Sequence, residues 1–336
     1  MFDGKKILIT GGSGSLGQAL TKRLLQMGVD TVRIFSRNES IQVKMKSKFK
    51  DERLRFLLGD IRDYSRLVRS FEDIDIVFHA AALKHVPVIE YNPFEAIKTN
   101  VIGTQNVIDA CIEQDVKIAV GIGTDKAVSP LNTYGATKLL MEKLFVTANS
   151  YTNPEKHSTK FIATRYGNVL GSSGSVVPIF AKQIREKKKV TITDPNMTRF
   201  SMNMDEALDF ILESASIGKG SEIFIPKLRA YSIIDLKNAL VEMVGDTGEE
   251  FTGIRNGEKV HEVLINEDEI SYAWELNDKY ILFNPMRDEE EIKKLYPKIK
   301  KVNLSHYSSD HVEKIPIPEL KKIISNSGIL KIKEEL

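Results

Sequence analysis

The sequence predicts an α/β fold, a doubly wound parallel sheet followed by a smaller C-terminal lobe. Three observations predict it. Short apolar strands alternate with helical segments through the first half of the chain, a glycine-rich turn joins the first strand to the first helix, and the alternation loosens after about residue 165. Alternating strands and helices imply right-handed crossovers, which place helices on both faces of a parallel sheet.

The elements of the first half follow in order. Lys6–Thr10 is a short apolar strand, and apolar residues then recur at helical spacing from Leu16 to Met27, until Gly28 ends the helix. A long helix is expected from Asn92, its cap, through Pro93 as first residue, to about Gln114. Further buried strands are expected at Thr31–Phe35, Leu54–Leu58, Ile74–Phe78 and Lys117–Ile122.

The second half is expected to form a separate lobe. Residues 1–165 are assigned to the nucleotide-binding domain and 166–336 to the lobe, with a segment near 200–225 returning to the main sheet. Within the lobe, helices are expected at Asp205–Ile217 and Ile233–Val244, a strand at Glu222–Ile225, and a loop-rich stretch punctuated by Gly171–Gly174 and Pro178.

Composition limits the function classes. With 42% hydrophobic and 28% charged residues and a net charge of +2, the 336-residue chain is an ordinary globular protein without a nucleic-acid-binding surface. The only cysteine, Cys111, excludes a Cys-based zinc site, and no metal site is expected. Neither a signal peptide nor a membrane span is recognisable, so we expect a cytoplasmic protein that binds a small molecule.

The turn after the first strand is typical of a dinucleotide site. Glycines 11, 14 and 17 allow a tight turn, a close approach to a pyrophosphate and close packing of helix on strand. The helix N-terminus then faces the anion. The residues expected to contact the cofactor here are Gly11, Ser13, Gly14, Ser15, Leu16 and Gly17.

The residues after the second strand favour NADP over NAD. Ser36 and Arg37 supply a hydroxyl and a guanidinium suited to a 2′-phosphate, where an NAD enzyme typically has an acidic residue. Glu39 lies nearby and keeps NAD as the minority alternative. Asp60, followed by Ile61, is expected to meet the adenine amino group, although Gly-Asp is also an ordinary turn pair.

A tyrosine and a lysine one helical turn apart indicate hydride-transfer chemistry. Tyr134 and Lys138 share a helix face, so the ammonium is expected to lower the pKa of the phenol and to hold a nicotinamide ribose. The same spacing recurs at Tyr296 and Lys300, where Pro297 disfavours a helix. Only the first pair follows a buried strand that ends in a hydroxyl residue, Thr124.

These motifs together resemble the extended short-chain dehydrogenase/reductases, and within them the inverting UDP-N-acetylglucosamine 4,6-dehydratases of pseudaminic acid synthesis. The resemblance runs from residue 11 to about 262 and implies a Rossmann domain, with Ala80 and Ala81 also at the cofactor. It rests on His79-Ala-Ala-Ala-Leu-Lys-His-Val-Pro87, Thr124-Asp-Lys126, Tyr134-Gly-Ala-Thr-Lys138, Arg165-Tyr-Gly-Asn168, Gly174-Ser-Val-Val-Pro178, Thr198-Arg-Phe200 and Gly257-Glu-Lys259.

The resemblance implies a dehydration in which two adjacent residues carry the elimination. Retaining relatives have Asp-Glu after the threonine, whereas this chain has Asp125 and Lys126, so Lys126 becomes the expected base at C5 and Asp125 the acid for the departing C6 hydroxyl. The alternative interpretation of this pair is a solvated loop. If Lys126 reprotonates C5 from the opposite face, the configuration there inverts, as the resemblance implies.

A UDP-sugar needs cations or amides for its phosphates. The resemblance assigns its binding to Lys84, His85, Asn168, Val176, Val177, Pro178, Arg199, Arg255 and Glu258. The chain departs from the family pattern at Ser173, Ser201 and Asn256, where arginine, tryptophan and proline are usual. These departures do not touch the chemical step, so they bear on the identity of the sugar rather than on the type of reaction.

Three alternatives stay open. A UDP-sugar 4-epimerase needs the same cofactor and Thr124, Tyr134 and Lys138, but neither Asp125 nor Lys126. A retaining 4,6-dehydratase acting on another nucleotide sugar is the second, and a non-catalytic dinucleotide sensor is the third. The resemblance further implies a homo-oligomer, because helices near 92–114 and 134–148 commonly pack between subunits of the family.

Overall fold

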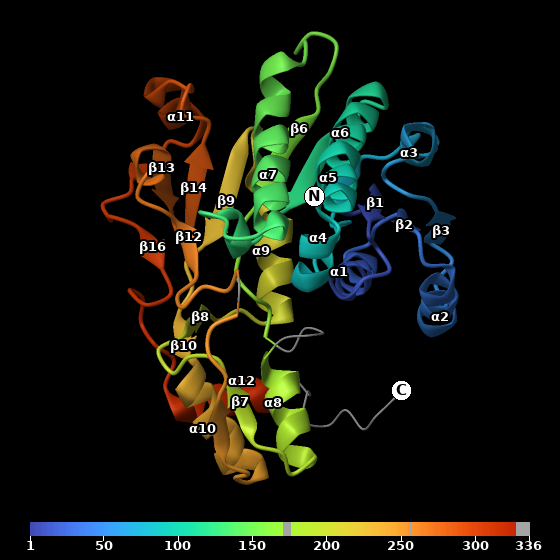
Figure 1. Cartoon of the computed structure of the whole chain (residues 1–336). Helices are drawn as coiled ribbons and strands as arrows, with labels where there is room; N and C mark the ends of the chain where they lie inside the picture. Colours follow the sequence, from blue (N-terminus) through green and yellow to red (C-terminus); the bar gives the residue numbers. More distant parts are fainter. Residues whose placement is uncertain (171–175, 256, 327–336) are drawn as a thin grey trace. The chain divides into compact units, whose positions relative to one another are not determined.

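The structure is a computed structural model that describes residues 1–170, 176–255 and 257–326. The chain forms two compact units (Figure 1). Unit 1 consists of Met1–Arg165, Leu208–Pro226 and Ser271–Asn303. Unit 2 contains the described residues of Tyr166–Ala207, Lys227–Ile270 and the segment from Leu304 onward.

Unit 1 contains a ten-stranded sheet in the order β15-β13-β14-β9-β6-β5-β4-β1-β2-β3. The strands from β9 to β3 pair in parallel, and β14, β13 and β15 extend the sheet antiparallel. The sheet therefore confirms the predicted doubly wound architecture. Its strands are β1 Lys6–Thr10, β2 Thr31–Ser36, β3 Leu54–Leu58, β4 Ile76–His79, β5 Ile118–Ile122, β6 Lys160–Thr164, β9 Glu222–Pro226, β13 Ala273–Leu276, β14 Lys279–Phe283 and β15 Lys300–Lys301.

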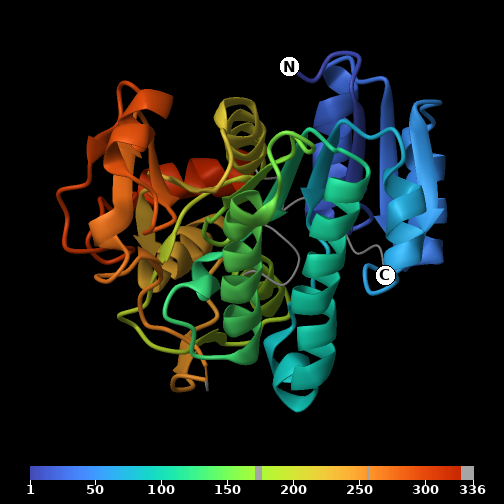
Figure 2. The ribbon, with the colours of Figure 1, turned by 90° about the horizontal axis from the view of Figure 1, so that it is seen from above.

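Helices cover both faces of this sheet (Figure 2). On one face α3, α6 and α7 pack in succession. On the other, α1 and α9 are joined by an ion pair between Arg23 and Asp209. The central strands are apolar along their length because both faces are buried. The helices of unit 1 are α1 Ser15–Gln26, α2 Glu39–Phe49, α3 Tyr64–Phe71, α4 Val86–Tyr91, α5 Pro93–Ile97, α6 Gly103–Glu113, α7 Thr133–Tyr151, α11 Glu289–Leu295 and most of α9, Met204–Ile217.

The expected helix from Asn92 to Gln114 is interrupted. A π-helical turn, η1 Lys98–Ile102, joins α5 to α6. Asn92 stands at the N-cap position, but its side chain donates to the Val88 carbonyl instead of capping the helix. Such π turns widen a helix locally and are frequent at functional sites, and this one carries the buried Asn100.

Unit 2 has its own apolar core. Helices α8 Val176–Arg185, α10 Ile233–Val244 and α12 Ile317–Asn326 pack around it, and three short strand pairs flank it. The pairs are β7 Val190–Ile192 with β11 Glu249–Phe251, β8 Thr198–Phe200 with β10 Ala230–Ser232, and β12 Val263–Ile265 with β16 Tyr307–Ser308.

Two sequence expectations differ from this architecture. Pro178, expected in a loop, lies in the first turn of α8, where its missing N–H costs no hydrogen bond. Residues 171–174, expected in the same loop, lie outside the described residues. Ser271–Asn303, assigned to the lobe, belongs to unit 1 because β14 pairs with β9 and extends the main sheet. Among the described residues, no helix combines the length and apolarity needed to span a membrane.

Candidate active site

The glycine turn between β1 and α1 is shaped for close backbone contact. Gly11 has φ +67°, and a Cβ there would come within 2.8 Å of the Ala81 backbone at the end of β4. A Cβ on Gly17 would lie 2.4 Å from the Gly12 carbonyl oxygen. The α1 N-terminus begins after Gly14 without a side-chain cap, so its N–H groups can serve an anion. This cradle fits a dinucleotide pyrophosphate.

Beside this turn, the end of β2 presents one fixed and one exposed polar group. The Ser36 hydroxyl is buried and accepts a hydrogen bond from Gln42 Nε2 at 2.9 Å. Arg37 is 53% exposed and lies 3.6 Å from Asp60 Oδ2. Although burial opposes it, hydrogen bonding and attraction by Arg62, with a smaller contribution from Arg37, keep the pKa of Asp60 below its usual range. Arg37 is therefore the more accessible group for a further phosphate.

The segment after β4 is braced from two sides. The Ala81 amide donates to Thr10 Oγ1 at 3.3 Å. Asn100, in the π turn, accepts from the Leu83 amide at 2.8 Å and donates to its carbonyl at 2.9 Å. It also donates to Thr137 Oγ1 of α7 at 3.0 Å. Asn100 thus links the segment after β4 to α7. Sequence analysis missed this role, since the only available signal was a polar residue within an apolar helix.

Asp125–Ala127 form a short 3₁₀ turn after β5, with Thr124 at its N-cap. The Thr124 hydroxyl donates to Asp125 Oδ1 at 2.9 Å, and Lys126 Nζ donates to the same oxygen at 3.0 Å. The Asp125 side chain is 1% exposed, and that of Lys126 is 28% exposed. Asp125 Oδ2 is buried and has no hydrogen-bond partner among the described residues. The pair is therefore not the solvated loop of the alternative interpretation.

Tyr134 lies against this turn. Burial raises the pKa of its phenol; the Lys126 charge and hydrogen bonding with Thr124 lower it, and the Asp125 charge raises it, with a net upward shift. The cation that lowers the pKa of Tyr134 here is Lys126, and the action of Lys138 on Tyr134 stays a prediction.

Lys138 is buried one helical turn along α7. Its Nζ donates to the Ile122 carbonyl at the end of β5. Burial lowers the pKa of Lys138 to about 8, against the opposing effect of Glu142. Together with burial, Lys138 lowers the pKa of His79 to about 3, so His79 is a neutral core histidine between Thr10 and Thr104.

A buried ion pair that sequence analysis did not predict lies near Lys138. Glu142 and Arg165 are both fully buried, and Arg165 NH2 donates to Glu142 Oε2 at 2.8 Å while its Nε lies 3.2 Å from the same oxygen. Glu142 also lies close to Gly123: a Cβ added at Gly123 would lie 2.5 Å from Glu142 Oε1. The spacing of Tyr134, Lys138 and Glu142, four residues apart on one helix face, was the available signal.

The second tyrosine–lysine match, Tyr296 and Lys300, has a structural role. Tyr296 caps the C-terminus of α11, and its hydroxyl donates to the buried Glu222 at 2.9 Å. Burial and the charge of Glu222 raise the pKa of Tyr296. Lys300 lies in β15, outside any helix.

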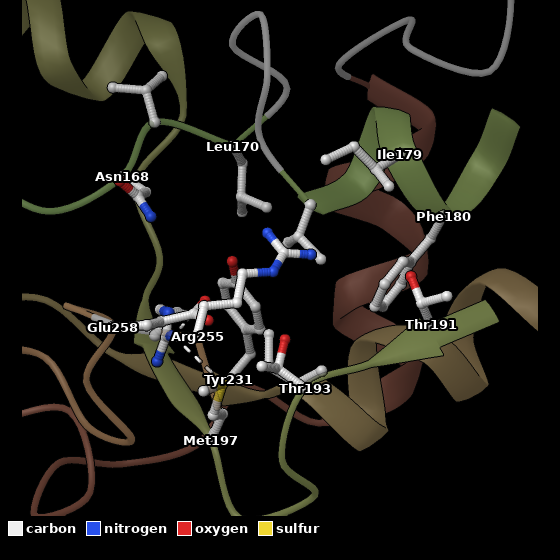
Figure 3. A pocket seen from close by; sticks show the side chains of 14 residues that line it. Asn168, Leu170, Ile179, Phe180, Thr191, Thr193, Met197, Tyr231, Arg255 and Glu258 are labelled. Atoms are coloured by element: carbon white, nitrogen blue, oxygen red, sulfur yellow. Dashed lines mark hydrogen bonds and ion pairs between the residues drawn. The ribbon is translucent and has the colours of Figure 1, made fainter. Parts of the chain in front are cut away.

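Several of the expected substrate residues line one pocket of unit 2 (Figure 3). The pocket measures about 180 Å³ and includes Asn168, Val176, Arg199, Arg255 and Glu258. Val177 instead packs in the apolar core, and Pro178 is not part of the lining. Lys84 and His85 lie exposed in unit 1, just before α4. Ser173 and Asn256 lie outside the described residues, and Ser201 is buried.

The two arginines of the pocket differ. Arg199 is 6% exposed, and its NH1 and NH2 donate to the carbonyls of Thr198, Val260 and Lys259. Its charge faces Glu258 at 3.6 Å and Glu262 at 3.5 Å. Arg255 is exposed, and its guanidinium extends into the middle of the pocket (Figure 3). Arg199 is thus committed to the pocket wall, whereas Arg255 is placed to meet a ligand.

Comparisons with known proteins agree with this geometry. Residues 7–284 match the family described as polysaccharide biosynthesis protein. An inverting UDP-N-acetylglucosamine 4,6-dehydratase of Campylobacter jejuni is 47% identical over 284 residues, covering 84% of each chain. A UDP-glucose 4-epimerase of Rickettsia felis is 39% identical, covering 100% of this chain and 99% of its own. The solved structure of Pen from Bacillus thuringiensis superposes with a TM-score of 0.89 at 41% identity, covering 98% and 99%.

Proposed function

Because this chain belongs to the polysaccharide biosynthesis protein family of extended short-chain dehydrogenase/reductases, we propose that it is a UDP-N-acetylglucosamine 4,6-dehydratase that inverts C5. An enzyme of the nucleotide-sugar dehydratase and epimerase type is the broader conclusion that the comparisons support. One observation carries the finer proposal: Lys126 and the buried Asp125 are joined at 3.0 Å next to Thr124 and Tyr134.

Each residue of the cluster has a defined part in this chemistry. A bound NADP⁺ would supply the acceptor for the C4 hydride and, once reduced, the hydride for C6. Tyr134, in the phenolate form that the Lys126 charge and the Thr124 hydrogen bond favour, accepts the proton of the C4 hydroxyl, and Thr124 orients that hydroxyl. The C5 hydrogen, now α to a ketone, passes as a proton to Lys126, while Asp125 protonates the departing C6 hydroxyl, which leaves as water. Lys126 then returns a proton to C5 from the opposite face.

The Lys126–Asp125 pair already holds the proton that this elimination requires. A base at C5 and an acid at C6 mean a neutral amine beside a protonated carboxyl, which has the same proton count as the ion pair. Their 3.0 Å hydrogen bond allows one proton to pass between them. The unpartnered Asp125 Oδ2 is the atom we assign to the C6 hydroxyl.

The cofactor we propose is NADP. Arg37 supplies an exposed guanidinium at the end of β2, where a 2′-phosphate would be met, and Ser36 lies beside it. The absence of side chains at Gly11 and Gly17, where a Cβ would clash with the backbone, keeps the turn tight enough to hold a pyrophosphate. Asp60 is ionised beside Arg37, so it suits an amino or hydroxyl donor of the adenosine.

The pocket of unit 2 is the proposed site for the UDP portion. Its lining combines apolar side chains with the polar Asn168, Arg255 and Glu258, as a nucleotide site requires. Arg255 provides the fork for phosphate oxygens, and Glu258, whose Oε2 is buried without a hydrogen-bond partner among the described residues, accepts from a ligand hydroxyl or amide. Lys84 and His85 stay proposed contacts on unit 1.

A 4-epimerase is the second candidate, favoured by the likeness to the Rickettsia felis enzyme over the whole chain. Incubation with UDP-glucose and UDP-N-acetylglucosamine separates the two. Formation of a 4-keto-6-deoxy product supports the dehydratase, and formation of the C4 epimer without loss of water supports the epimerase. No turnover despite NADP binding supports a sensor.

We also propose a cytoplasmic homo-oligomer. Large apolar side chains are exposed along the helices at 86–113 and 133–151, which a second subunit would cover. They are Val88, Tyr91, Phe94, Ile97, Ile102, Leu140 and Tyr151. Cys111 is buried and free, in keeping with a reducing compartment. Light scattering of the full chain tests the assembly, and a monomer would contradict it.

A further inference from the structure

Three metal-ligating side chains lie together in unit 2, in residues that the proposed reaction does not use. His306, Asp310 and His311 come from one loop around β16, and their ligand atoms all lie within 4.8 Å of one another. His306 Nε2 lies 3.2 Å from His311 Nδ1, and that nitrogen lies 3.1 Å from Asp310 Oδ2.

These separations match the edges of a metal polyhedron. Ligands bound tetrahedrally at roughly 2.0–2.1 Å from a zinc ion lie about 3.3 Å apart. The two measured edges, 3.2 and 3.1 Å, therefore leave room for a cation with only small adjustments. Imidazole nitrogens and a carboxylate suit Zn²⁺, Co²⁺ or Ni²⁺ better than Mg²⁺ or Ca²⁺.

Neighbouring hydroxyls orient the ligands. Ser308 Oγ donates to Asp310 Oδ1, which leaves Oδ2 for a metal, and Ser305 Oγ contacts His306 Nδ1 at 3.0 Å, which leaves Nε2. Such outer contacts fix the ligating atom.

The loop is also anchored to rigid structure. Ser309, between the ligands, is fully buried; its hydroxyl lies 2.7 Å from Thr198 Oγ1 and accepts from the Glu262 amide at 2.9 Å. Its own amide donates to the Glu262 carbonyl at 2.8 Å. A site held on packed strands keeps its ligands in place better than one on a free loop.

We propose that His306 Nε2, His311 Nδ1 and Asp310 Oδ2 bind one divalent late first-row metal ion, of which Zn²⁺ is the natural occupant. A water molecule fills the remaining position. The ion cross-links the two ends of the loop and stabilises unit 2, and it takes no part in the elimination.

Cobalt titration of the full-length, untagged, chelator-treated chain tests this site, because tetrahedral Co²⁺ has visible absorption bands. We expect one Co²⁺ per chain, displaced by Zn²⁺, and a rise in Tm on binding. His306→Ala and Asp310→Asn should each weaken binding more than about tenfold, and Ser308→Ala about tenfold. His157→Ala, on a histidine of unit 1, is the matched control and should bind like the parent.

Absence of stoichiometric binding would overturn the proposal. So would unchanged binding by both His306→Ala and Asp310→Asn, or preference for Mg²⁺ over Co²⁺. Asp310→Asn retains the shape of the side chain, so a circular dichroism spectrum like that of the parent separates loss of metal from loss of fold.

Discussion

The ammonium of Lys126 lies 3.0 Å from the carboxylate of Asp125, whose side chain is 1% exposed. The same carboxylate oxygen accepts from the Thr124 hydroxyl. In the proposed reaction Tyr134 serves the C4 hydroxyl, so a redox reaction alone would leave the Asp125–Lys126 pair without a task. The pair is what distinguishes an elimination from a simple oxidation or an epimerisation.

Replacing Lys126 by alanine should lower the rate of water elimination by about 10²-fold or more, the usual range for a general base. Lys143→Ala, on an exposed lysine of α7, is the matched control and should keep the parental rate. Rates follow from product formation with UDP-N-acetylglucosamine. A fully active Lys126→Ala variant would remove the elimination scheme.

The two tyrosine–lysine matches should respond oppositely to loss of their hydroxyls. Tyr134→Phe should abolish turnover with little change in Tm. Tyr296→Phe should retain turnover but lose about 1–3 kcal/mol of unfolding free energy, since the buried Glu222 loses a hydrogen bond. Activity and urea unfolding of both variants check this contrast, and an inactive Tyr296→Phe enzyme of normal fold would contradict it.

The buried Lys138 should make stability depend on pH. Its pKa of about 8 lies below the ordinary 10.5, so between these values the unfolded chain binds more protons than the folded one. Its contribution to the unfolding free energy therefore rises with pH through this window, by on the order of 3 kcal/mol in total. Urea unfolding at about pH 7.5 and 9.5 should show the rise in the parent and its loss in Lys138→Met. Parallel pH dependence in both proteins would exclude this account.

Glu142→Gln should destabilise the fold, because it removes the buried carboxylate charge that lies 2.8 Å from the guanidinium of Arg165. Breaking one side of a buried ion pair costs about 3–5 kcal/mol. The double variant Glu142→Gln with Arg165→Met should recover part of that loss. Chemical denaturation of the single and double variants measures the coupling, and additive effects would show that the pair does not act as a unit.

Substitutions of the two pocket arginines should affect different properties, UDP binding for Arg255 and thermal stability for Arg199. Arg255→Ala should weaken UDP binding by about tenfold or more and leave Tm unchanged, since its side chain is exposed. Arg199→Ala should lower Tm, because three backbone carbonyls lose their donor. Calorimetric UDP titration and thermal unfolding test both variants. A stable Arg199→Ala protein with impaired UDP binding would reverse the assignment.

The sequence predicted the sheet well because its signals are local. The period of apolar residues located Lys6–Thr10 and Ile233–Val244 at their observed bounds. It missed the π turn at Lys98–Ile102, which depends on long-range contacts of Asn100 with Leu83 and Thr137. Likewise, the placement of β13 and β14 in the main sheet depends on pairing between distant strands.

The site was predictable in its residue types but not in its electrostatics. Spacing placed Tyr134 and Lys138 on one face of α7, yet burial and Lys126, both set by tertiary packing, dominate the pKa of Tyr134. The sequence resemblance predicts a phosphate ligand at Arg199, but two of the three carbonyls that accept from it belong to Val260 and Lys259, about 60 positions away. Such partners leave no local pattern.

NMR of the product formed from UDP-N-acetylglucosamine in deuterated water tests the central claim most directly. The account predicts a new C6 methyl group, deuterium at C5, and coupling constants of the inverted C5 configuration. A product that retains its C6 hydroxyl and differs from the substrate only in C4 configuration, with no deuterium at C5, would contradict it.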